Sequence, residues 1–385
     1  MKKLIFGFAL LLSSQLGVAQ TYYPLADPCD PDKIFDKLPS AAYDNTCVYL
    51  LRMSSQPFNK FPMEVFRYPN LKELTVQNAN ISAVPIDVYL LDNVEVLDLS
   101  NNNLTSIPNT IGDMKKLRKL ILRNNKLNTL PVIIANCKNL EELDITGNPI
   151  TFLPNEINNL QALTTFKFSG NEVKNPKFLL DMVRQMKNIT SLDLSGCNLN
   201  FVPSDVKYLT KLTELNLSNN NIHFLPSELG MLTNLQTLIL GDDASSGNRI
   251  YDLPTSFSNL RNLRNLQAPN NGFVDFPMVL CSLPKLEVLN LSNNKIQELP
   301  AEVSMMSGLN KLNIMNNQLA DVPDELAALS RLTQFDFSGN QFTGEVQQKI
   351  LRMMSGETTT APAEKAMPAK KVKAPAKKKA ASKKK

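Results

Sequence analysis

The chain has 385 residues and a formal net charge of +5, and its length alone would predict two or three domains. The charge is uneven. Residues 357–385 hold ten lysines and two glutamates, and removing this +8 and the two lysines near the N-terminus leaves −5 for residues 20–356. The basic balance therefore belongs to the tail, and the charge of the body excludes it as a platform for nucleic acid.

The first residues have the pattern of a secretory signal (residues 1–19). Lys2 and Lys3 precede an apolar run over residues 4–12, and small residues follow up to Ala19. This order predicts export with cleavage after Ala19, although a signal anchor or a chance apolar N-terminus would share part of the pattern. The apolar run is too short to cross a bilayer, which needs roughly 20 residues, and we expect no transmembrane segment. The predicted location is secreted or extracytoplasmic, in the periplasm or at the cell surface.

Residues 20–47 are predicted to form an N-terminal cap, and they contain Cys29 and Cys47. In an oxidising compartment, a disulfide between these two would close an 18-residue step and contribute about 3 kcal/mol. The alternative is a pair of free thiols. The other cysteines fall at inward-pointing positions of the repeats described next and are predicted to be buried structural thiols: Cys137, Cys197 and Cys281.

One motif recurs in a single register through the middle of the chain. "VEVLDLSNNNLTSIP" begins at Val94, "LRKLILRNNKLNTLP" at Leu117 and "LEVLNLSNNKIQELP" at Leu286. Ten of the twelve steps between repeats are 23 residues, one is 26 and one is 28. Marked by the first apolar position, the thirteen repeats start at residues 48, 71, 94, 117, 140, 163, 189, 212, 235, 263, 286, 309 and 332.

The pattern L-x-x-L-x-L-x-x-N-x-L resembles that of leucine-rich repeat proteins, and the resemblance covers residues 48–342. It implies an α/β solenoid, a horseshoe of about thirteen coils. A parallel β-sheet would line the concave face, with turns and short helices on the convex face. In each coil the x-L-x-L-x segment is a short strand with inward leucines, and an apolar residue before proline fixes an extended turn.

The asparagine of the motif sits where the chain leaves the strand. Its amide can bond backbone groups of neighbouring coils, which predicts a ladder that satisfies buried polar atoms. Gln56, Ala79 and Cys197 replace it in three coils, where the ladder should be weaker or broken. The predicted ladder residues are Asn102, Asn125, Asn148, Asn171, Asn220, Asn294, Asn317 and Asn340.

Two repeats are longer than the others. In the 26-residue step, Pro176 and apolar residues at helical spacing predict a helix. In the 28-residue step, "GDDASSGNR" predicts a loop at the rim of the solenoid. After the repeats, we expect a capping helix over residues 343–356 and a disordered lysine-rich tail over residues 357–385.

No catalytic motif occurs, and we expect no enzyme, cofactor or metal site. The only histidine, His223, lies on a repeat turn, which is a structural position. Asp98 and Asp144 occupy the same strand position two repeats apart, at about the carboxylate spacing of inverting glycosidases. Asp or Asn fills that position in other repeats, however, so the carboxylates are better explained as repeat consensus.

The concave face is mostly Asp, Asn, Ser and Thr, and departures from this background mark candidate contacts. An isoleucine ringed by alternating charges predicts a protein-contact patch, although single exposed apolar residues are common. This first patch comprises Asp98, Lys119, Ile121, Arg123, Asp144 and Lys167. The second candidate is Ile239 with Asp242 and Asp243, beside the inserted loop.

The lysine-rich tail has three competing explanations. It could tether the protein to polyanions such as lipopolysaccharide, acidic polysaccharide, anionic lipid or extracellular DNA. It could bind nucleic acid inside the cell, which would require that residues 1–19 are not a secretory signal. It could also serve only to keep the protein soluble. The tail lysines that would carry binding are Lys370, Lys371, Lys373, Lys377, Lys378, Lys379, Lys383, Lys384 and Lys385.

The resemblance, the signal pattern of residues 1–19 and the lysine-rich tail together predict an exported recognition scaffold. It would bind a protein or glycan on its concave face and be anchored by its tail. The alternatives are a structural envelope or matrix component with a merely solubilising tail, and an intracellular protein associated with nucleic acid.

Overall fold

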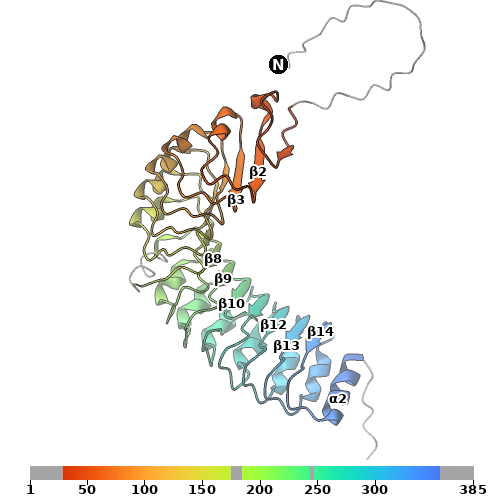
Figure 1. Ribbon diagram of the computed structural model, residues 1–385. Helices are drawn as coiled ribbons and strands as arrows, with labels where there is room; N and C mark the ends of the chain where they lie inside the picture. Colours follow the sequence, from red (N-terminus) through yellow and green to blue (C-terminus); the bar gives the residue numbers. More distant parts are fainter. Residues whose placement is uncertain (1–28, 175–183, 243–246, 356–385) are drawn as a thin grey trace, which may run out of the picture. The chain divides into compact units, whose positions relative to one another are not determined.

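The computed structural model describes residues 29–174, 184–242 and 247–355. In these residues the strands form a parallel sheet of fourteen strands, and their order follows the sequence. Each of the thirteen predicted repeats contributes one strand, β2 to β14, and β1 adds another at the N-terminal end (Figure 1). The strands are β1 Ile34–Phe35, β2 Leu50–Ser54, β3 Glu73–Gln77, β4 Val96–Asp98, β5 Lys119–Ile121, β6 Glu142–Asp144, β7 Thr165–Lys167, β8 Ser191–Asp193, β9 Glu214–Asn216, β10 Thr237–Ile239, β11 Asn265–Gln267, β12 Val288–Asn290, β13 Lys311–Asn313 and β14 Gln334–Asp336.

The chain divides into two compact units, which are described separately. The first consists of Met1–Leu199 with Tyr208–Asn216, and the second of Asn200–Lys207 with Leu217–Lys385. In both units the coils return from strand to strand through short 3₁₀ helices. These helices are η1 Asn45–Cys47, η2 Met63–Arg67, η3 Ile86–Leu90, η4 Asn109–Asp113, η5 Val132–Asn136, η6 Asn155–Asn159, η7 Ser204–Tyr208, η8 Ser227–Met231, η9 Thr255–Asn259, η10 Met278–Ser282, η11 Ala301–Met305 and η12 Asp324–Ala328.

The fully described coils are built as the repeat predicts. In the coil of β4, Leu97 and Leu99 are buried because alternate strand residues point to opposite faces. Pro108 (φ −68°, ψ 152°) then directs the chain into η4, whose Ile111 is buried under the strand residues. Because proline fixes φ and has no N–H to leave unpaired, it can stand directly before a helical turn. The predicted extended turns at proline are confirmed.

The asparagine ladder is present. Asn125, for example, donates from Nδ2 to the carbonyl oxygens of Leu122 in its own coil (2.9 Å) and Leu99 in the preceding coil (3.0 Å). Its Oδ1 accepts from the Leu104 N–H (3.0 Å). Each predicted ladder residue likewise donates to the carbonyl three residues earlier: Asn102, Asn148, Asn171, Asn220, Asn294, Asn317 and Asn340.

Two further ladder asparagines were not predicted. Asn248 donates to the carbonyl oxygens of Leu217 and Leu240 (both 2.8 Å), and Asn271 donates to that of Pro269 (3.0 Å). Asn248 lies beyond the inserted loop, so the insertion separates it from its strand without removing it from the ladder.

At Cys197, where an asparagine is missing, the ladder is altered but continues. The thiol donates to the Phe168 carbonyl oxygen (3.3 Å), and the Val173 N–H donates to the Cys197 carbonyl instead of to a side chain (3.2 Å). Cys197 and Cys137 are fully buried and Cys281 is nearly so, as predicted. Burial raises the pKa of the Cys197 thiol to about 12 and those of the other two to about 11. These thiols are therefore protonated and unreactive at neutral pH.

The residue before each ladder position adopts a left-handed backbone. It is asparagine in some coils, such as Asn101 (φ 55°) and Asn124 (φ 53°), and glycine in others, such as Gly147 (φ 66°). A side chain at Gly147 would meet the Asn124 Oδ1 at 2.3 Å, so glycine at this position avoids that contact as well as the strain of a positive φ. In the recurring "NN" and "GN" pairs, the first residue therefore adopts the left-handed backbone and the second is the ladder asparagine.

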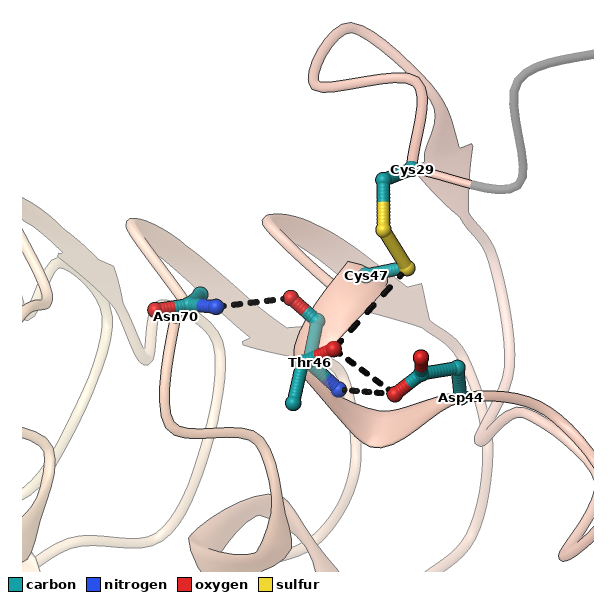
Figure 2. Close-up of a disulfide and its surroundings, with 5 residues drawn as sticks. All are labelled: Cys29, Asp44, Thr46, Cys47 and Asn70. Atoms are coloured by element: carbon teal, nitrogen blue, oxygen red, sulfur yellow. Dashed lines mark hydrogen bonds between the residues drawn. A yellow bond between two sulfur atoms is a disulfide. The ribbon is translucent and has the colours of Figure 1, made fainter. Parts of the chain in front are cut away.

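The N-terminal cap is closed by a disulfide between Cys29 and Cys47, whose Cα atoms lie 4.4 Å apart (Figure 2). Next to Cys47, Thr46 donates from its N–H and its hydroxyl to the Asp44 carboxylate (2.9 and 2.7 Å). Both hydrogen bonds lower the pKa of Asp44, and the bond from the Thr46 hydroxyl lowers it more than the bond from the Thr46 N–H does. Asn70 of the following coil donates to the Thr46 carbonyl (2.8 Å), which joins the cap to the repeats.

Helix α2 (Gly344–Ser355) follows the last coil, where the sequence predicts a capping helix. Ile350 is fully buried, and Lys349 pairs with Asp321 (3.2 Å) and Asp324 (2.8 Å) at the last 3₁₀ helix. Leu351 is 59% exposed, because it lies about 100° around the helix from Ile350.

Several predicted features lie outside the described residues. They are the secretory signal, the inserted loop at residues 243–246, most of the helix expected from Pro176, and the lysine-rich tail. In the described part of the chain, no helix combines the length and apolar character needed to span a membrane.

Candidate functional site

The strand side chains that alternate with the buried leucines form what we call the open sheet face. In the first unit, pairing of β4 to β7 places Asp98, Ile121, Asp144 and Lys167 in one row across this face. Lys119 belongs to the neighbouring row, and Arg123 follows β5. The structure therefore brings the six residues of the first predicted patch together, and we call this set, with Glu142, the β4–β7 cluster.

Ion pairs hold the charged residues of the cluster. Glu142 bridges Lys119 (3.2 Å) and Lys167 (2.8 Å), and Arg123 lies 3.5 Å from the Asp144 carboxylate. Burial alone would raise the pKa of Glu142, but the hydrogen bonds and charges of Lys167 and Lys119 outweigh it, so the pKa lies below its usual value. Burial would likewise lower the pKa of Lys167, and Glu142 and Asp144 raise it instead. The three cations and three carboxylates of the cluster balance each other.

Asp98 and Asp144 have structural roles. Asp98 accepts from the Ser100 N–H (2.9 Å), and Asp144 accepts from the Thr146 N–H (3.1 Å). The two residues are only 8% and 2% exposed. In other coils, an Asp or Asn at this position likewise accepts a hydrogen bond from the N–H two residues later, which explains why the repeat favours these two residue types. The residues that do so are Asp193, Asn290, Asn313 and Asp336.

Glu142 was missed by the sequence analysis although it organises the cluster. Its signal was available, because the 23-residue step places it directly beside Lys119 in the paired register. Ile121 is half-exposed between the buried carboxylates of Asp98 and Asp144. The cluster thus presents one apolar side chain surrounded by charged groups that are already fixed in place.

The second predicted patch, in the second unit, is less suited to ligand contact. Ile239 is half-exposed, as Ile121 is, but Asp242 accepts from the Asn219 side chain (2.7 Å). The Asp242 carbonyl accepts from the Asn270 side chain (2.6 Å). Asp242 therefore continues a row of polar residues that joins successive coils, while Asp243 lies outside the described residues.

The open sheet face of the second unit also carries a groove of about 500 Å³ across β11 to β14, which was not predicted. Val288 is half-exposed on its floor and Lys311 is exposed beside it. Among the described residues Lys311 has no carboxylate partner. The remaining outward side chains that line the groove are Gln267, Asn290, Asn313, Gln334 and Asp336. In the described residues, no group of three or more His, Cys, Asp or Glu side chains could hold a metal ion.

Comparisons with known proteins agree on the type of repeat. A model described as a leucine-rich repeat region matches residues 62–198, and a leucine rich repeat model matches residues 180–244 and 282–342. No match was found among the curated proteins compared.

Among solved structures, a leucine-rich repeat protein of Leptospira interrogans is 25% identical, with a TM-score of 0.59 over 84% of this chain and 98% of that one. A plant peptide hormone receptor, RGFR1 in complex with RGF2, is 26% identical, with a TM-score of 0.61 over 80% of this chain and 53% of the receptor. An internalin of Listeria monocytogenes, at 24% identity with a TM-score of 0.58 over 74% of this chain and 85% of that one, is similar in fold alone.

Proposed function

The chain belongs to the leucine-rich repeat family, and from this premise we propose that it is an exported, non-enzymatic recognition protein that binds a protein segment on its open sheet face. The observation that carries the proposal is the β4–β7 cluster, in which half-exposed Ile121 is surrounded by charged side chains held in ion pairs.

Fixed side chains favour binding because less rotamer freedom is lost when a partner arrives. Lys119 and Lys167 share Glu142, so both long side chains are already restrained. Ile121 supplies an apolar contact at the centre, and the surrounding charges give a polar rim, which is the usual arrangement of a protein interface. Because its charges balance, the cluster would select a partner by shape and local pairing.

A protein segment is a better candidate for this face than a glycan, because the β4–β7 cluster has no aromatic side chain on which a sugar ring could stack. The plant receptor, which is described as a peptide hormone receptor in complex with RGF2, supports the same choice. This chain spans about half of that receptor's length, so the likeness supports a mode of binding and names no ligand.

Export is supported by the signal pattern of residues 1–19 and by the disulfide of the cap. Disulfides persist in oxidising compartments and are rare in the cytosol. A secreted or cell-surface location therefore fits both features.

The central role of Ile121 can be tested with peptides selected on the protein itself from a displayed random library. Ile121→Asp should weaken the selected peptides by at least tenfold, because it removes the apolar contact and places a charge beside two carboxylates. The matched control is Ile86→Asp, since Ile86 is 69% exposed on η3, away from the open sheet face. Equal peptide binding by Ile121→Asp and the unchanged protein would contradict the proposal.

The tail is the anchor in this proposal. It carries ten lysines, and each contact with a polyanion releases counterions, so binding should weaken steeply as salt rises. Residues 20–385 should bind vesicles containing 30% anionic lipid at 50 mM salt and release them by about 300 mM, while residues 20–355 should not bind. Sedimentation with the vesicles measures both. Equal retention of the two forms would show that the tail is no tether.

A further inference from the structure

A second surface, separate from the open sheet face, lies on the segment between the ladder position and the proline of each coil. In most coils its outward positions hold small or polar residues, such as Ser82, Thr105 and Thr129. Four successive coils depart from this background, and their residues all belong to the second unit. We call this set the aromatic rim: Phe201, Phe224, Tyr251 and Val274.

The aromatic rim is exposed. Phe224 is 66% exposed, Tyr251 48%, Phe201 43% and Val274 41%. The rings of Phe224 and Tyr251 nevertheless contact each other, with centroids 4.9 Å apart and planes at 79°. Such an edge-to-face pair fixes both rings while leaving the outer face of each in water. The rim therefore presents rigid apolar surface that no described part of the chain covers.

Side-chain amides and a small net negative charge surround the rings. The Asn221 side chain donates to the Asn200 side chain (2.9 Å), which gives a fixed row of amides next to Phe201 and Phe224. Between the ladder position and the proline of the same and the next coils, the exposed charged residues are three carboxylates and two cations, a net charge of −1: Asp252, Asp275, Glu298, Arg249 and Lys295.

The size of the rim limits what it can bind. Large aromatic side chains offer about 150–250 Å² each, so at these exposures the rim amounts to roughly 400 Å² of apolar surface. That area is of the size that is often functional on a monomer, but it is about half of what one partner buries in a standard protein interface. A small or linear ligand therefore fits better than a folded protein.

We propose that the aromatic rim binds a neutral oligosaccharide. The C–H bonds on the face of a sugar ring are weakly positive and are attracted to the negative face of an aromatic ring. The hydroxyl groups would bond the Asn200 and Asn221 amides and the Asp252 carboxylate. Because the surrounding charges sum to only −1, an uncharged ligand gains these contacts without the repulsion that an anionic ligand would meet. This binding is independent of a protein segment on the open sheet face.

The test titrates the full chain with a panel of neutral hexasaccharides built from glucose, mannose, galactose or N-acetylglucosamine, with hexagalacturonate as the charged comparison, by isothermal calorimetry. At least one neutral member should bind in the micromolar to millimolar range. The double variant Phe224→Ser/Tyr251→Ser should weaken it at least tenfold, because both stacking faces are lost. Serine and threonine fill these positions in other coils, so the fold should persist, and an unchanged Tm verifies this.

Two controls separate stacking from general stickiness. Tyr251→Phe keeps the ring and should bind within threefold of the unchanged protein. Phe152 is 56% exposed and lies in the first unit, at the repeat position that Thr129 fills in the preceding coil. Phe152→Ser removes this aromatic ring, which is outside the aromatic rim, and should leave binding unchanged. No binding by any neutral hexasaccharide, equal binding by the double variant, or preference for hexagalacturonate would each overturn the proposal. Neither the Ile121 variant nor the removal of the tail should affect this titration.

Discussion

Replacing Asn148 by alanine is expected to lower the free energy of unfolding by about 3 kcal/mol. Asn148 is 3% exposed, donates to the Ile145 and Leu122 carbonyls (2.9 and 3.0 Å), and accepts from the Leu127 N–H (3.1 Å). Alanine would leave these backbone groups buried without a partner, and each such group costs about 1–3 kcal/mol. Denaturant unfolding followed by circular dichroism measures the loss.

Two variants calibrate this result. Asn155→Ala changes an exposed amide in the same coil and should alter stability by less than about 0.5 kcal/mol. Asn148→Cys copies the arrangement at Cys197, where the thiol donates to a carbonyl of the preceding coil and the Cys197 carbonyl accepts the N–H bond that an asparagine side chain would accept. Asn148→Cys should therefore lower the free energy of unfolding by less than Asn148→Ala does. If Asn148→Ala were as stable as Asn155→Ala, the ladder would not stabilise the coils as described.

Breaking the disulfide is expected to lower the free energy of unfolding by about 3 kcal/mol, because the bond closes an 18-residue step in the unfolded chain. The effect should be concentrated in the cap. Strand β1 has only two residues, and its Ile34 is 49% exposed, so little apolar packing holds it against β2. In the Cys29→Ser/Cys47→Ser variant, hydrogen exchange over residues 34–54 should accelerate by at least tenfold, as measured by mass spectrometry.

The other cysteines make this experiment specific. Cys137, Cys197 and Cys281 are buried, and their raised pKa values keep them protonated. A reductant should therefore reproduce the effect of the double serine variant on the folded protein. Exchange that stayed unchanged over residues 34–54 would mean that strand pairing and the Asn70–Thr46 bond hold the cap without the disulfide.

Much of the fold could be predicted because the repeat encodes it locally. The 23-residue step fixes which strand pairs with which, so a motif starting at Leu117 predicts β5 beside β4 and β6. The ladder follows from the same count, which also places Asn271 eight residues after the repeat start at residue 263, although that asparagine was overlooked. Asn248 was missed because five inserted residues separate it from its strand, although the backbone still returns it to the ladder.

The candidate sites were harder to predict because they depend on side-chain pairing. The sequence placed Lys119 and Lys167 on one face but did not show that Glu142 joins them. Asp242 was predicted as a contact residue, but the sequence did not show that it bonds to Asn219, because this bond depends on an asparagine at the left-handed position of one coil reaching the next coil. The aromatic rim was visible as a departure from the repeat consensus, but its exposure required the structure.

The ladder also has a consequence for how such a protein changes over generations. Asn125 bonds only to its own coil and to the one before it, and the strands pair only with their sequence neighbours. A duplication or deletion of 23 residues would therefore exchange one complete set of partners for another and leave no backbone group unmatched. The heritable unit of variation is the single coil, so the reach of the recognition surface can be lengthened or shortened in steps of about 4.8 Å while the two capped ends stay as they are.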